Sequence, residues 1–160
     1  MDFDVLIEVP TDNQVKYEVD KESGEIRVDR FLHTSSVFPY NYGFIKNTEG
    51  QDGDPLDVMV ISSERIYPGA AIKCHAVGLL EMEDESGVDT KILAVPDKKI
   101  DPVFGIYDSI DDVPEASKKL IKQFFQVYKS LEPGKWVKVK EFKGAGEAKK
   151  MIEKFSLFKV

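Results

Sequence analysis

The segment AIKCHAVGLLEMEDESGVDTKILAV, residues 71–95, contains two apolar runs on either side of an acidic turn at 83–87. Short apolar runs bounded by turn residues are typical of β-strands. We therefore expect an antiparallel pair of strands here, with Asp84 and Asp89 on either side of the tip. These two acids are candidates for a site, although plain turn acids would look the same in the sequence.

A second hairpin is predicted over residues 15–31. Val15, Tyr17 and Val19 share one face of an extended chain, and a turn at 21–24 leads to a return strand. Many short strands joined by hairpin turns favour a small barrel. The further strand signals lie at 58–61, 71–80, 91–95 and 135–140.

Helical periodicity occurs only late in the chain. Apolar residues recur at three- and four-residue spacing over 114–131 and again over 146–158, and Pro133-Gly134 ends the first run. We expect two amphipathic helices packed on the barrel. The apolar positions are Leu120, Ile121, Phe124, Phe125, Tyr128 and Leu131 in the first helix, and Ala148, Met151, Ile152 and Phe155 in the second.

Composition narrows the class of protein. With 160 residues, 42% of them hydrophobic, residues 1–160 are expected to form a single domain with a real core. Cys74 is the only cysteine, which excludes an intrachain disulfide and disfavours a zinc site. The net charge of −7 argues against a nucleic-acid partner. No apolar run has membrane length and no basic leader is present, so we expect a cytoplasmic protein without a membrane partner.

The most informative motif is Asp52-Gly53-Asp54-Pro55-Leu56-Asp57. In an extended stretch Asp52 and Asp54 point to the same side, and a turn at Pro55 would bring Asp57 beside them. Two carboxylates about 6 Å apart repel by roughly 2.8 kcal/mol at an effective dielectric constant of about 20. The motif therefore predicts a site for a hard cation such as Mg²⁺ or Mn²⁺, although a solvated acidic turn is the ordinary alternative.

Further motifs follow in order along nearly the whole chain. With the acidic motif, they make the sequence similar to the soluble family I inorganic pyrophosphatases of the prokaryotic, single-domain kind. They are Ile7-Glu8-Val9-Pro10, Lys16-Tyr17-Glu18, Val28-Asp29-Arg30-Phe31, Asn41-Tyr42-Gly43, the segment from Asp84 to Lys91, Tyr128-Lys129 and Gly134-Lys135-Trp136-Val137-Lys138-Val139.

The resemblance implies a fold, an activity and an assembly. The fold would be mainly β with flanking helices (α+β), a five-stranded closed barrel like those that bind oligonucleotides or oligosaccharides, with two helices on it. The activity would be hydrolysis of pyrophosphate to two phosphates with several Mg²⁺ ions, Mn²⁺ being a substitute, and without a covalent intermediate. Prokaryotic members also imply a homohexamer.

The resemblance also implies roles for individual residues. Asp54 would accept the proton of the attacking water, and Glu8 and Glu18 would hold metals through water or bind those arriving with substrate. The ligands of the water-activating metals would be Asp52, Asp57, Asp84 and Asp89. The phosphate-binding set would be Lys16, Arg30, Tyr42, Lys91, Tyr128 and Lys129.

Taken without the resemblance, several of these residues have simpler interpretations. Lys16 and Glu18 could form a solvated strand face, and Tyr128 lies on the apolar stripe of its helix. Simple alternation places Arg30 on the face opposite Lys16, so its role requires a bulge or a strand end. Phe38 stands where bacterial members usually carry tyrosine, which we expect to tune the activity rather than abolish it.

Two other functions compete with pyrophosphate hydrolysis. Small barrels also serve as binding modules for oligonucleotides or sugars, which would require a basic or aromatic groove. A metal-dependent nucleotide hydrolase would require a pocket in which a base can stack. The clustered aspartates and the acidic net charge disfavour the first, and no sequence feature identifies the second.

Overall fold

The computed structural model describes residues 1–158 of the chain. Nine strands, two α-helices and one short 3₁₀ helix make up this part. No helix in it combines the length and the apolar character needed to cross a membrane. The strands are β1 (Asp2–Val9), β2 (Val15–Val19), β3 (Ile26–Phe31), β4 (Asn41–Ile45), β5 (Asp57–Val60), β6 (Ala71–Asp84), β7 (Gly87–Val88), β8 (Lys91–Pro96) and β9 (Val137–Gly144). The helices are η1 (Ile110–Asp112), α1 (Glu115–Val127) and α2 (Ala145–Phe155).

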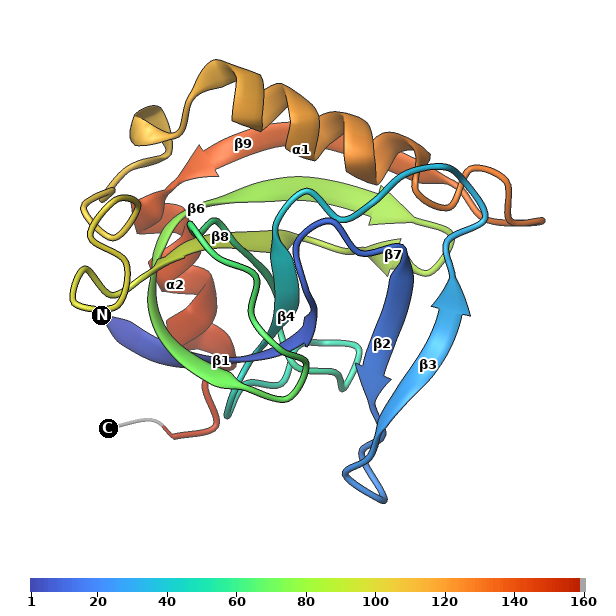
Figure 1. Ribbon diagram of the computed structural model, residues 1–160, viewed down its shortest axis with the longest axis horizontal. Helices are drawn as coiled ribbons and strands as arrows, with labels where there is room; N and C mark the ends of the chain where they lie inside the picture. Colours follow the sequence, from blue (N-terminus) through green and yellow to red (C-terminus); the bar gives the residue numbers. More distant parts are fainter. Residues whose placement is uncertain (159–160) are drawn as a thin grey trace.

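Five strands close into a barrel. The order of pairing is β1–β4–β5–β8–β6, and β6 pairs back onto β1, so the circuit is complete. All of these pairs are antiparallel except β5 with β8, which is parallel. The predicted five-stranded barrel with two helices is confirmed. β7 and β9 pair with the second half of β6. β2 and β3 form a separate hairpin beside the barrel (Figure 1).

The central strands are buried on both faces, which explains their apolar runs. In β5, Val58 and Val60 belong to one core cluster while Met59 belongs to another. One cluster joins the barrel to α1, and the other joins it to α2. The strand therefore sits between two apolar layers rather than between a core and water.

Both helices follow the predicted spacing and end earlier than the sequence suggested. In α1 the buried side chains are Ile121 and, one turn later, Phe124 and Phe125, and in α2 they are Ala148 and Ile152. Helix α1 lies along β9 (Figure 1). Tyr128 and Lys129 follow directly after the end of this helix and line a cavity together with residues of the β2–β3 hairpin.

The predicted hairpins form, with strand ends that differ by a few residues. Glu83 pairs with Val88 at the tip of the second hairpin, and β6 continues four residues beyond the predicted end at Leu80. Gly43 in β4 allows the close packing of β1 and β4, because a Cβ there would lie 1.9 Å from the Leu6 carbonyl oxygen.

Candidate active site

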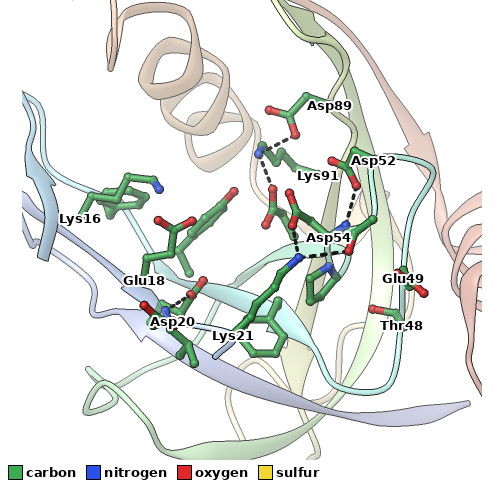
Figure 2. A pocket seen from close by; sticks show the side chains of 18 of the residues that line it. Lys16, Glu18, Asp20, Lys21, Thr48, Glu49, Asp52, Asp54, Asp89 and Lys91 are labelled. Carbon is green, nitrogen blue, oxygen red and sulfur yellow. Dashed lines mark hydrogen bonds and ion pairs between the residues drawn. The ribbon is translucent and has the colours of Figure 1, made fainter. Parts of the chain in front are cut away.

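A cavity of roughly 680 Å³ opens between the β2–β3 hairpin and the barrel. Figure 2 shows Lys16 and Glu18 on one side of it, facing Asp52, Asp89 and Lys91 on the other. Every predicted site residue except Asp84 lines this cavity. They are Glu8, Lys16, Glu18, Arg30, Tyr42, Asp52, Asp54, Asp57, Asp89, Lys91, Tyr128 and Lys129.

Lys91 lies between two of the predicted metal ligands. Its ammonium nitrogen is 2.8 Å from the Asp57 carboxylate and 2.9 Å from that of Asp89. Burial alone would lower the pKa of Lys91, but Asp57, Tyr42 and Asp89 outweigh it and hold that pKa well above its ordinary value. Lys91 is therefore a permanent cation beside these carboxylates. Burial raises the pKa of Asp89. The positive charge of Lys91 lowers that pKa but does not cancel the effect of burial.

Asp84 reaches the site only indirectly. It does not line the cavity, and its carboxylate lies 3.0 Å from the Lys129 ammonium group. Lys129 does line the cavity and also lies 3.3 Å from Glu85. In this arrangement Asp84 and Glu85 hold the Lys129 side chain in place.

The acidic motif forms a turn rather than the extended stretch predicted from the sequence. The Gly50 amide donates to the Asp54 carbonyl at 2.8 Å, and Gly53 adopts a φ of 82°, which glycine tolerates without strain. The Asp52 carboxylate accepts a hydrogen bond from the Asp54 amide at 3.0 Å. The alternation of an extended stretch does not apply here, because side-chain and backbone hydrogen bonds close the turn locally.

Asp54 contacts the opposite hairpin. Its carboxylate forms a close ion pair with Lys21, whose ammonium group also lies 3.1 Å from the Gly53 carbonyl oxygen. Both side chains are largely exposed. The contact joins the β2–β3 turn to the acidic turn across the cavity mouth (Figure 2).

A bulge in the β2–β3 hairpin brings Arg30 to the cavity. Lys16 pairs with Arg30, whereas Tyr17 pairs with Val28, so the register shifts by one residue at Asp29. This shift places Lys16 and Arg30 on the same face of the hairpin. The resemblance required this arrangement, whereas simple alternation predicted opposite faces. The guanidinium of Arg30 lies 3.0 Å from the buried Glu132 carboxylate and in close contact with Asp29.

Glu8 is a buried carboxylate on β1. It accepts a hydrogen bond from the Val19 amide at 2.9 Å, which ties the barrel to the hairpin. Burial raises its pKa to about 7, and the neighbouring Asp57 and Glu18 add to the increase. The side chain can therefore be neutral or charged near neutral pH.

The aromatic residues serve the core and the cavity at once. Tyr42 and Tyr128 are buried in the cluster beneath α1 and also line the cavity. Burial raises the pKa of both phenols, so they are neutral at physiological pH. Tyr128 is therefore a core aromatic, as its place on the apolar stripe predicted, and it also lines the cavity. Phe38 is buried between Tyr42 and Phe124 and lines the same cavity.

The donor atoms fit a hard divalent cation, although they are not gathered around one point. Within residues 1–158, no three His, Cys, Asp or Glu side chains lie close enough together to hold a metal ion. Lysine side chains offset much of the predicted repulsion between the carboxylates, since Asp54, Asp57 and Asp89 each contact a lysine. Carboxylate oxygens are nevertheless the ligands that Mg²⁺ prefers. The raised pKa values of Glu8 and Asp89 indicate that an additional cation would be favourable beside them.

The sequence analysis assigned no role to three residues of the site. Lys21 lies in a hairpin turn, where a lysine is unremarkable. Glu132 and Glu85 are distant in sequence from the Arg30 and Lys129 side chains that they contact. Each of these three residues is a charged side chain that the fold brings to the site. No local sequence pattern marks such a residue.

Comparison with known proteins identifies the family of this chain. A family model described as inorganic pyrophosphatase matches residues 5–157. The chain is 50% identical to the inorganic pyrophosphatase of Aquifex pyrophilus over 153 residues, which cover 96% of this chain and 86% of that protein. It is 52% identical to that of Aeropyrum pernix over 150 residues, covering 94% and 85% of the two chains.

Solved structures give the same result. The fold is similar to an inorganic pyrophosphatase from Helicobacter pylori, with a TM-score of 0.94 and 46% identity over 98% of this chain and 91% of that one. A Coxiella burnetii inorganic pyrophosphatase gives a TM-score of 0.93 and 45% identity, over 98% and 93% of the chains. This chain belongs to the inorganic pyrophosphatase family and is a hydrolase that cleaves pyrophosphate.

Proposed function

We propose that this cavity hydrolyses pyrophosphate by direct attack of water, with Mg²⁺ as the cofactor and Mn²⁺ as a substitute. One observation carries the proposal: a single cavity is lined by carboxylates from the barrel and by Arg30, Lys16, Lys91 and Lys129. Carboxylates suit divalent cations, and the basic groups suit the oxygens of a phosphoanhydride.

The basic residues bind and orient the substrate. Arg30 is anchored by Glu132 and Asp29, so its planar fork can grip two phosphate oxygens in a fixed direction. Lys16 and Lys129 act as point charges, and the neutral phenols of Tyr42 and Tyr128 donate hydrogen bonds. Phosphoryl transfer depends mostly on such positioning and charge neutralisation.

The acidic residues hold the cofactor and move one proton. Asp52, Asp57, Asp84 and Asp89 are the proposed metal ligands, with Glu8 and Glu18 at the periphery. Asp84 lies outside the cavity lining and would have to exchange its contact with Lys129 for the metal. Bound Mg²⁺ would neutralise phosphate charge and lower the pKa of the attacking water. Asp54 would accept the proton of the attacking water, a role for which a carboxylate is basic enough only when the pKa of that water is lowered. Lys21 contacts Oδ1 of Asp54, so Oδ2 is the oxygen proposed to accept the proton.

We also propose that residues 1–160 act as one domain, in a cytoplasmic homohexamer. Both rest on the resemblance to prokaryotic members of the family whose model matches residues 5–157. Exposed apolar side chains such as Phe31, Ile106 and Leu131 offer surface for self-association. Light scattering at micromolar concentration and neutral pH should give the mass of six chains, and a monomer would reject the hexamer.

The chemistry is tested by supplying pyrophosphate and ATP separately with Mg²⁺, Mn²⁺ or Ca²⁺. We expect phosphate release from pyrophosphate with Mg²⁺, less with Mn²⁺ and little with Ca²⁺, which is larger and less demanding in geometry. Preferential release from ATP would favour a nucleotide hydrolase instead.

A further inference from the structure

The loop between β4 and β5 carries Asp52 and Asp54, and its two ends are joined. The Ile45 amide at the end of β4 donates to the Leu56 carbonyl at 2.9 Å. The intervening loop projects toward the cavity, and Thr48 and Glu49 line the cavity together with the acidic residues (Figure 2). Ile45 and Leu56 thus form the stem of the loop. The position of the loop on this stem determines where the carboxylates of Asp52 and Asp54 lie.

A single side-chain hydroxyl crosses the stem. The Thr48 hydroxyl donates to the Ile45 carbonyl at 2.7 Å and accepts from the Leu56 amide at 3.0 Å. Thr48 is 5% exposed, and both hydrogen bonds are buried. Without this hydroxyl the Leu56 amide would be left without a partner, because water cannot easily replace it there.

The outer side of the same loop is held by the segment after α2. The Glu49 amide donates to the Phe155 carbonyl, and the Leu157 amide donates to the Asn47 carbonyl, both at 2.9 Å. Thr48 and Ser156 face each other in this short antiparallel bridge. The loop thus has backbone support on one side and depends on the Thr48 hydroxyl on the other.

From Thr48 the support continues to the carboxylates. Gly50 is hydrogen bonded to the Asp54 carbonyl, and the Asp54 amide to the Asp52 carboxylate, so the turn behaves as one small unit. A change at the stem would displace both carboxylates together. We propose that Thr48 is a positioning residue whose hydroxyl fixes this unit and thereby sets the affinity of the site for a divalent cation.

This inference rests on the proposed metal-dependent function, and the chain provides a matched set of variants. Thr48→Val keeps the shape and removes the hydroxyl, whereas Thr48→Ser keeps it. Thr11→Val is the control, because the buried Thr11 hydroxyl has no hydrogen-bond partner in the structure described over residues 1–158. Thr11 does not line the cavity.

The measurement is Mn²⁺ binding by electron paramagnetic resonance, well below the unfolding temperature, with thermal unfolding in chelator recorded alongside. Thr48→Val should bind Mn²⁺ about tenfold more weakly, the factor that corresponds to about 1.4 kcal/mol. Thr48→Ser and Thr11→Val should bind it within about twofold of the unmodified protein. This pattern would support the positioning role.

Two results would overturn the inference in distinguishable ways. If the unmodified protein binds Mn²⁺ and Thr48→Val binds it equally well while only unfolding earlier, Thr48 is a structural residue and the proposed function stands. If the unmodified protein does not bind Mn²⁺, the metal-dependent function fails and the role of Thr48 fails with it.

Discussion

The ammonium group of Lys91 lies 2.8 Å from the Asp57 carboxylate, in a place where the Lys91 side chain is only 4% exposed. Together with the contact to Asp89, this ion pair puts a positive charge among the proposed metal ligands. The protein thus carries part of the charge compensation for its acidic site in its own sequence. Metal ions would have to supply the remainder.

Lys91→Met should destabilise the metal-free protein. The substitution keeps the aliphatic volume but leaves Asp57 and Asp89 without their shared cation. We expect the free energy of unfolding in chelator to fall by about 2 kcal/mol, the usual cost of leaving a buried polar group without its partner. The control is Lys99→Met, at an exposed loop position. Equal stability of Lys91→Met and the unmodified protein would show that the ion pair contributes nothing.

Asp54→Asn should mainly lower turnover, whereas Asp57→Ala should mainly lower metal affinity. Asp54→Asn removes the proposed proton acceptor but keeps the shape, so turnover should fall by about 10²–10⁴-fold with metal affinity largely retained. Asp57→Ala removes a proposed ligand and should weaken metal binding. Because Asp57 is paired with Lys91, its removal should not stabilise the metal-free fold.

Metal titrations and pH–rate profiles of the two variants separate these roles. Near-normal turnover of Asp54→Asn would remove Asp54 from the mechanism. Loss of metal as severe as in Asp57→Ala would instead make Asp54 a ligand.

Glu8 should make stability depend on pH in the metal-free protein. Its pKa is about 7 in the folded state, against an ordinary value of 4.5 for a glutamate in water. Between these values the native state holds more protons than the unfolded state, so stability falls as pH rises and the loss is complete above about pH 7. The difference of about 2.5 pKa units corresponds to about 3 kcal/mol.

Glu8→Gln should therefore stabilise the metal-free protein at pH 8 by up to about 3 kcal/mol and have little effect at pH 4. Glutamine can still accept the hydrogen bond from Val19. Denaturant unfolding in chelator at both pH values provides the measurement, with Glu22→Gln in the exposed hairpin turn as the control. A variant that is equally stabilising at both pH values would contradict the assignment.

Phe38→Tyr should change turnover by no more than about tenfold, since a neutral hydrogen bond contributes about 0.5–1.5 kcal/mol. The ring lies against Phe124 at a centroid distance of 4.7 Å, and it should keep this packing. Steady-state kinetics with pyrophosphate would measure the effect. A change of more than about a hundredfold would mean that the residue at this position takes part in the chemistry.

The barrel could be predicted in outline because its strands and helices carry local patterns. The two-sided burial of β5 and β8 produces apolar runs, and the periodicity of α1 marks its buried face. β1 and β4 were not predicted, and β4 is short and contains Gly43. The parallel pairing of β5 with β8 is a long-range feature that no local pattern reports.

The sequence predicted which residues lie near the cavity but not how their side chains are arranged. The motifs contain the predicted residues that line the cavity and also Asp84, which does not, whereas the bulge that aligns Lys16 with Arg30 depends on pairing between strands. The same holds for Lys21 on Asp54 and Glu132 on Arg30, which are contacts between residues far apart in the sequence. Such contacts follow from the closed fold and leave no local signal.

Phosphate release from pyrophosphate, measured with Mg²⁺ and again after addition of excess chelator, tests the metal-dependent site most directly. We predict rapid release with Mg²⁺, loss of release in chelator and recovery when Mg²⁺ is restored in excess. Release that continues undiminished in excess chelator would contradict the proposal that the carboxylates around Lys91 act by holding metal ions.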